Sequence, residues 1–242
     1  MLHKTRGIVF SYTEYRETSL IVKIYTELFG IQSYIVNSVR KKNAKLNVGW
    51  FQPLTLVDLV VYHKERHGLQ RIAEIRPMPP LKDIPFDVIK SAIILFIDEV
   101  LCKTIKEEEE NQLLFEFLFN TIQLFDIQQP ASNDFHLLFL IRLTRYLGFY
   151  PIQNFNQATP YFNLIDGKFQ SEIPLHPYYL NEKAALNFSN LILNSADLSA
   201  KLNLPGEEKR TLIENLLEYY RLHVPNFSNV KSHKVLEQIF DS

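Results

Sequence analysis

The chain has 242 residues, of which 46% are hydrophobic and 22% are charged, and its formal net charge at pH 7 is −1. These values are typical of a soluble globular protein that buries a sizeable core. No run of eighteen apolar residues occurs, and the charged N-terminus lacks the apolar stretch of a signal peptide, so we expect neither a membrane span nor a signal peptide. The single cysteine, Cys102, excludes an internal disulfide and a cysteine-rich zinc site and fits a reducing cytoplasm.

The charges are distributed unevenly along the chain. Residues 1–80 contain twelve Lys and Arg against six Asp and Glu, whereas residues 81–242 contain fourteen against twenty-one. The nearly neutral total therefore conceals a basic first third and an acidic remainder. This division predicts that one part of the protein meets a polyanion and the other meets proteins.

Five short segments in the first eighty residues have the alternation and the β-branched or aromatic content of strands. They are residues 5–12, 18–26, 31–36, 53–62 and 70–76. Five strands in so short a stretch suit a small closed barrel better than a sandwich, because closure removes the exposed edges. Residues 37–47, between the third and fourth strands, contain four cations and predict an exposed basic loop.

The proline-rich residues 76–80 interrupt both periodicities and mark a boundary, after which helical spacing prevails. The run of four glutamates at 107–110 is expected at the start of a helix, where carboxylates favour the positive end of the helix dipole. Residues 133–148 are apolar on nearly all sides, which predicts the central helix of a bundle. Further helices are expected in residues 89–101, 113–125, 182–193, 207–223 and 231–240.

These patterns predict an α+β protein with two domains. Residues 1–78 form the five-stranded barrel, and residues 79–242 form a helical domain that carries a small hairpin insert at 152–177, around the Asp166-Gly167 turn. No glycine-rich phosphate loop, GxSxG or HExxH motif is present, and Cys102 lies within an apolar helical pattern. We therefore predict that the chain is not an enzyme and holds neither a cofactor nor a metal.

Cations and aromatic residues are interleaved in the first fifty residues, a pattern typical of nucleic-acid binding. Cations neutralise phosphates, and exposed rings stack on unpaired bases. No recognition helix is visible, so binding should be largely independent of sequence. Two alternatives remain: tyrosines that fill the barrel beside solvated cations, and ion pairs of Lys4 and Arg6 with Glu14 or Glu17. The candidate DNA contacts are Lys4, Arg6, Arg16, Lys23, Tyr34, Arg40, Lys41, Lys42 and Lys45.

Several stretches along the chain resemble the RecO family of bacterial recombination mediators. They include Lys4-Thr-Arg-Gly-Ile-Val9, Tyr15-Arg-Glu-Thr-Ser-Leu-Ile-Val22, Gly148-Phe-Tyr-Pro151 and Tyr219-Tyr-Arg-Leu-His-Val-Pro225, and together they span nearly the whole length. The resemblance implies an N-terminal OB-fold and a C-terminal helical bundle. It also implies a cytoplasmic, nucleoid-associated protein that binds single- and double-stranded DNA, anneals complementary strands and helps to load the recombinase onto DNA covered by single-strand-binding protein (SSB). The implied partners are RecR and the acidic C-terminal tail of SSB.

One feature departs from the family pattern, and two arginines and two other functions remain to be considered. Many RecO proteins carry a four-cysteine zinc module in the helical domain, but residues 152–177 contain no cysteine, so we expect a metal-free hairpin in its place. Arg142 and Arg145 lie three residues apart on an apolar helix and are candidates for the SSB tail, with internal pairing to Glu99, Glu116 or another carboxylate of the bundle as the rival. An adaptor that binds only proteins, and an OB-fold protein that binds RNA, remain alternative functions.

Overall fold

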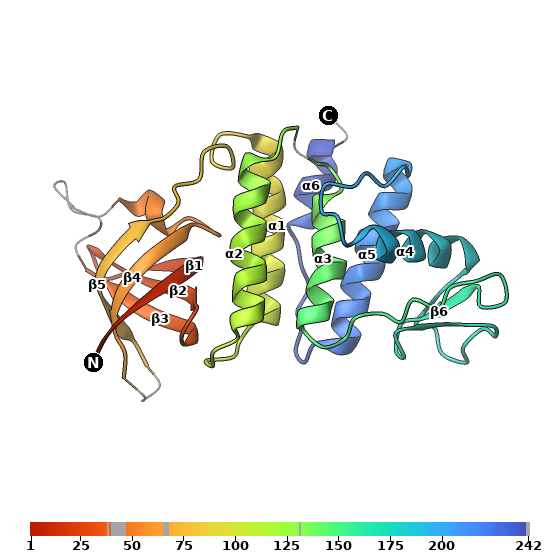
Figure 1. The fold of residues 1–242 in the computed structure, drawn as a ribbon, viewed down its shortest axis with the longest axis horizontal. Coiled ribbons are helices and arrows are strands. Elements are labelled where there is room, and N and C mark those ends of the chain that lie inside the picture. The colour runs from red at the N-terminus through yellow and green to blue at the C-terminus, as the bar shows by residue number, and fades with distance from the viewer. Residues whose placement is uncertain (38, 40–46, 65–67, 131, 241–242) are drawn as a thin grey trace. The chain divides into compact units, whose positions relative to one another are not determined.

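We describe a computed structural model of residues 1–240, except residues 38, 40–46, 65–67 and 131. The chain divides into two compact units, Met1–Gln128 and Gln129–Ser242. Figure 1 shows strands followed by two helices in the first unit, coloured red to yellow-green, and helices with a small sheet in the second, coloured green to blue. The predicted fold class, a five-stranded barrel followed by helices with a small inserted hairpin, is confirmed.

The barrel closes in the order β1-β2-β3-β5-β4, with β3 and β5 parallel and the other pairs antiparallel, as in an OB-fold. The long first strand bends at an irregularity between Val9 and Ser11, and this bend lets it pair with β4 on one side and β2 on the other. The strands are β1 (Leu2–Tyr15), β2 (Ser19–Thr26), β3 (Gly30–Val36), β4 (Leu56–Tyr62) and β5 (Gln70–Pro77).

The barrel interior is filled by the alternating residues that predicted the strands, including Val22, Ile24, Leu59 and Val61, each at most 1% exposed. Gly7 provides the room for them: a Cβ there would lie 2.6 Å from Cγ2 of Ile24. A short 3-10 helix, η1 (Val48–Phe51), precedes β4 and inserts the fully buried Phe51 into the core.

Two helices complete the first unit, α1 (Val88–Thr104) and α2 (Gln112–Ile127). The side chain of Asp87 caps α1, and that of Asn111 caps α2 by accepting a hydrogen bond from the Leu114 amide. The prediction that residues 107–110 begin a helix is wrong, because they form the connection between α1 and α2. The amide side chain of Asn111 is the cap, and the backbone at 107 is engaged by the barrel instead.

The segment between β5 and α1 is fixed to α2 by one carboxylate. Asp126, which is 4% exposed, accepts hydrogen bonds from the backbone amides of Lys82 (2.8 Å), Asp83 (3.0 Å) and Ile84 (2.9 Å). The buried Lys90 donates to the Asp126 carbonyl oxygen at 2.7 Å. The helices α1 and α2 belong to the same compact unit as the barrel. The predicted functional boundary between residues 78 and 79 stays a prediction.

The second unit is built around α3 (Phe135–Tyr146), which contacts α4 (Glu182–Asn194) and α5 (Gly206–His223). Burial on nearly all sides of α3 agrees with its apolar sequence. The buried hydroxyl of Tyr220 on α5 donates to the Leu140 carbonyl oxygen at 2.7 Å, which ties the two helices together. A short α6 (His233–Phe240) ends the described chain.

The insert forms a three-stranded sheet of β6 (Tyr161–Asn163), β7 (Lys168–Gln170) and β8 (Tyr179–Leu180), in the order β7-β6-β8. Phe162 packs against Phe169 at a ring-centroid distance of 4.7 Å and against Phe188 of α4 at 4.6 Å. Aromatic packing thus supports the hairpin. In the described part of the chain no group of three or more His, Cys, Asp or Glu side chains is arranged to hold a metal ion.

None of the described helices combines the length and the apolar character needed to cross a membrane.

Candidate nucleic-acid interface

Three predicted contacts are exposed cations on the barrel. Lys4 lies on β1, Arg16 in the β1–β2 turn and Lys23 on β2, opposite Ser11 and Ser33 of the neighbouring strands. Arg16 has a positive φ of 54°, and its guanidinium carbon lies 5.1 Å from the ring centroid of Tyr15. These side chains are accessible to a polyanion.

The structure separates Lys4 from Lys23. Lys23 pairs with Ser11, which is seven positions beyond Lys4 on β1, a distance of roughly 20 Å along a strand. Arg40, Lys41, Lys42 and Lys45 lie outside the described residues. In the described part of residues 1–77, seven Lys and Arg accompany five Asp and Glu, so most of the predicted positive charge belongs to that undescribed segment.

Tyr34 does not lie on the surface. Its exposed fraction is 0%, its ring belongs to the barrel core, and burial raises the pKa of its hydroxyl. A ring without exposed surface has no face to offer a base. We therefore withdraw Tyr34 from the predicted contacts; it has the core role that the alternative interpretation gave to the tyrosines.

Arg6 is engaged by carboxylates of the same unit. Its guanidinium donates to Glu27 through Nε (3.0 Å) and Nη2 (2.7 Å), and Nη2 also donates to Glu116 of α2. Hydrogen bonding to Glu27 is the main cause that raises the pKa of Arg6, and the same bond lowers the pKa of Glu27. Ion pairing of Arg6 was foreseen as a rival role, but with Glu14 or Glu17 as the partner.

A groove on the barrel was missed by the sequence reasoning. Among the described residues, β3 and β5 pair at Tyr34 with Gln70 and at Ile35 with Arg71, and a groove of about 380 Å³ lies where this pairing ends. The exposed Arg71 adds a cation at its wall. The alternation of β5 could have identified Arg71 as an outward residue. The groove is lined by Ile35, Val36, Asn37, Arg71, Ile72, Ala73, Glu74 and Ile75.

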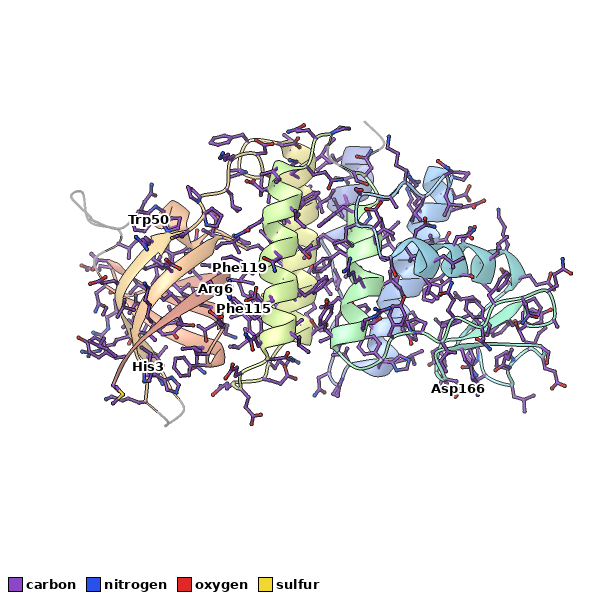
Figure 2. All side chains as sticks on the ribbon, in the orientation of Figure 1. His3, Arg6, Trp50, Phe115, Phe119 and Asp166 are labelled. Atoms are coloured by element: carbon purple, nitrogen blue, oxygen red, sulfur yellow. The ribbon has the colours of Figure 1, made fainter. Side chains whose placement is uncertain are left out.

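The barrel aromatics divide into buried and partly exposed rings. Tyr25 is 2% exposed, whereas Tyr12, Phe29 and Trp50 are half-buried and pack against the core. Phe29 is stacked on His63 at 3.8 Å, and His3 meets its edge at 5.2 Å, so this face of Phe29 is occupied. Figure 2 places His3 and Trp50 at different parts of the barrel.

In the second unit, Arg142 and Arg145 lie near the C-terminal end of α3. Arg142 is half-buried and donates to the Ala196 carbonyl oxygen at 2.9 Å, whereas Arg145 is exposed, with its guanidinium carbon 4.5 Å from the Tyr150 ring centroid. The two carboxylates named as rival partners are engaged within the first unit. Glu99 pairs with Lys103, and Glu116 pairs with Arg6.

Cys102 offers no nucleophile at neutral pH. Burial, followed by the charge of Asp98, raises the pKa of its thiol to about 12, so the thiolate is scarce.

Comparison with known proteins covers both parts of the chain. The family model described as Recombination protein O N terminal matches residues 1–80, and the model described as Recombination protein O C terminal matches residues 85–233. The chain is 38% identical over 242 residues to the DNA repair protein RecO of Bacteroides fragilis strain ATCC 25285, with all of both chains covered. It is 38% identical over 241 residues to that of Flavobacterium psychrophilum, with 98% of each chain covered.

Proposed function

Because the chain belongs to the RecO family of DNA repair proteins, we propose that it binds single- and double-stranded DNA through its barrel, anneals complementary strands and assists recombinase loading on SSB-covered DNA. The family acts in repair as mediators rather than as enzymes. The observation that carries the proposal is the full-length family match joined to a closed barrel with exposed Lys4, Arg16 and Lys23. Such a protein would act in the cytoplasm, at the nucleoid.

The proposed chemistry is neutralisation of phosphates while the bases stay free. Cations that track the backbone release counterions and reduce the repulsion between two strands. Two strands held in this way retain their pairing edges. Annealing therefore follows from electrostatics without a bond being made or broken.

Titration of labelled single-stranded DNA, duplex DNA and RNA between about 50 and about 300 mM salt tests this proposal. We expect both DNA forms to bind, and the logarithm of the affinity should fall linearly with the logarithm of the salt concentration. Replacing Arg40, Lys41, Lys42 and Lys45 together by Ala should reduce the magnitude of the single-strand slope by up to about 3, since each phosphate contact contributes about 0.7. Binding to no nucleic acid would favour the protein adaptor, and a clear preference for RNA would favour the RNA-binding alternative.

We also propose that RecR and the SSB tail are partners, and that Arg142 and Arg145 receive the tail. The exposed Arg145 offers a cation, and the adjacent Tyr150 ring offers an apolar surface. This combination suits an acidic peptide that also contains apolar residues. A tail peptide should bind the full chain and should lose most of its affinity to an Arg142→Ala, Arg145→Ala variant. Lys168→Ala, which removes an exposed cation of β7, is the control; equal affinity in the double variant refutes this assignment. RecR binding is tested by co-elution on gel filtration, where separate elution refutes it.

A further inference from the structure

Arg6 lies at the centre of an ion cluster between the barrel and α2. Its fork with Glu27 joins β1 to the β2–β3 turn region, and its bond to Glu116 reaches a helix 110 positions later in the chain. We define the Arg6 cluster as Arg6, Glu27, Glu116, Phe115 and Phe119. One cation faces two carboxylates in this cluster, so Arg6 has no positive charge to spare for a phosphate.

Aromatic rings hold the same guanidinium. Its carbon lies 5.3 Å from the ring centroid of Phe115 and 4.9 Å from that of Phe119, and both rings are buried. Figure 2 shows Arg6 extending from the barrel towards these two side chains of α2. Phe115 in turn packs on the barrel residue Tyr25 at 5.9 Å. A planar guanidinium can form the bidentate fork with a carboxylate and stack on the rings at the same time, whereas an ammonium is a point charge without this planar geometry.

A second contact fixes the connection before α2 to the barrel. The Ile31 amide donates to the Glu107 carbonyl oxygen at 3.0 Å. Gly30, with a φ of 58°, permits this approach, because a Cβ there would lie 2.4 Å from the Glu107 carbonyl oxygen and 2.5 Å from that of Glu109. The acidic segment, residues 107–110, is therefore held against the β2–β3 turn with all four side chains exposed.

The charges of the first unit balance. Residues 1–128 contain sixteen Lys and Arg and sixteen Asp and Glu, because the acidic residues of α1, α2 and their connection offset the basic barrel. The acidic segment lies at the β2–β3 turn, and Asn37 lies at the other end of β3, roughly 20 Å away by strand length. This distance exceeds the Debye length of about 8 Å at physiological salt, so the two ends present separate local potentials.

We infer that Arg6 is a positioning residue: it holds α2 and the acidic segment against the barrel. The side of the barrel at the β2–β3 turn, which we call the closed flank, is thereby closed to nucleic acid. DNA phosphates are repelled at the β2–β3 turn and directed to the cations elsewhere on the barrel. This inference rests on the proposed DNA binding. It specifies, in addition, the part of the barrel that the DNA strand avoids.

The test compares Arg6→Gln and Arg6→Lys in the full chain, with the variant that replaces Arg40, Lys41, Lys42 and Lys45 by Ala as the reference for lost phosphate contacts. Hydrogen exchange in residues 112–119 should rise in both Arg6 variants, because lysine restores the charge but not the bidentate fork or the planar stacking on the rings. The salt slope of single-stranded DNA binding should match that of the wild type in both. A slope reduced by about 0.7 in Arg6→Gln and restored in Arg6→Lys would make Arg6 a phosphate contact and overturn the inference.

Replacing Glu108, Glu109 and Glu110 by Gln tests the closed flank directly. We expect single-stranded DNA to bind about threefold or more tightly at about 50 mM salt, with the gain disappearing at about 300 mM as screening increases. Replacing three exposed glutamates of the second unit, Glu172, Glu207 and Glu214, by Gln is the matched control for an unspecific change of net charge. An equal gain in both variants, or none in the first, refutes the closed flank. If the wild type binds no DNA, the proposed function fails, while the exchange result still tests the role of Arg6.

Discussion

Removal of the Asp126 carboxylate is the most direct test of how the linker between β5 and α1 is fixed to α2. In Asp126→Ala, three backbone amides lose a charged acceptor at once. The amide of Ile84, a residue 5% exposed, has no access to water in the folded state, whereas Lys82 and Asp83 lie nearer the surface and their amides can rehydrate.

The magnitude follows from these differences. The buried amide costs about 2 kcal/mol, and the two rehydrated amides cost about 1 kcal/mol each, because hydrogen bonds to charged groups contribute about 1.5 to 3 kcal/mol before rehydration. We therefore expect Asp126→Ala to lower the free energy of unfolding of the first unit by about 4 kcal/mol. Asp126→Asn retains one acceptor oxygen and should lose about half as much.

Urea unfolding followed by tryptophan fluorescence measures this loss, because Trp50 is the only tryptophan and lies in the first unit. Asp58→Ala is the control: Asp58 pairs at 3.1 Å with an Arg76 side chain that is 64% exposed, and such a surface pair contributes less than about 1 kcal/mol. A loss below about 1 kcal/mol in Asp126→Ala would refute the view that this carboxylate fixes the linker.

Three further predictions concern two buried side chains and the glycine of the β2–β3 turn. Burial lowers the pKa of His136 to about 3. The free energy of unfolding should therefore be highest above the unfolded-state pKa of about 6.5 and should fall as the pH falls, by about 2 kcal/mol at about pH 5. Hydrogen exchange in α3 should report this decline, whereas Leu140→Ala should destabilise equally at every pH; a pH-independent wild type contradicts the prediction. Tyr34→Phe should change the free energy of urea unfolding by less than about 0.5 kcal/mol and leave DNA affinity unaltered, since the buried hydroxyl has no hydrogen-bond partner in the described structure. Gly30→Ala should cost about 2 kcal/mol or more, measured by Trp50 fluorescence in urea, because the left-handed backbone and the Glu107 carbonyl oxygen both oppose a Cβ; a smaller loss would show that residues 107–110 move away freely.

The barrel was predictable because each strand shows the alternation of apolar and polar residues in its own sequence. Alternation located all five strands to within a few residues, and the small number of residues favoured closure. The face of β3 was less predictable. Gln32, Tyr34 and Val36 point into the core while Ile31 and Ile35 remain half-buried on the other face, so apolar residues occupy both faces and the pattern does not identify the inner one.

Tertiary contacts account for what the sequence did not predict. Nothing near Arg6 in the chain indicates Glu116, which lies 110 positions away, and local reasoning therefore chose the neighbouring Glu14 and Glu17. Residues 107–110 satisfied the charge preference of a helix start, yet Asn111 provides the cap. Helix propensity at this point yields to the backbone bond between Ile31 and Glu107.

The division of charge in the sequence has a different meaning once the compact units are known. Divided after Gln128, the chain consists of a first unit with sixteen charges of each sign and a second with ten cations and eleven carboxylates. The polarity is therefore internal to the first unit, between the barrel and the α1–α2 pair, which Arg6 joins through its bond to Glu116. A DNA-binding body without net charge attracts phosphates only over short distances, through a local patch. Under the proposed DNA binding, such a local patch would hold a strand and still release it to its complement, whereas a uniformly cationic surface would retain both strands.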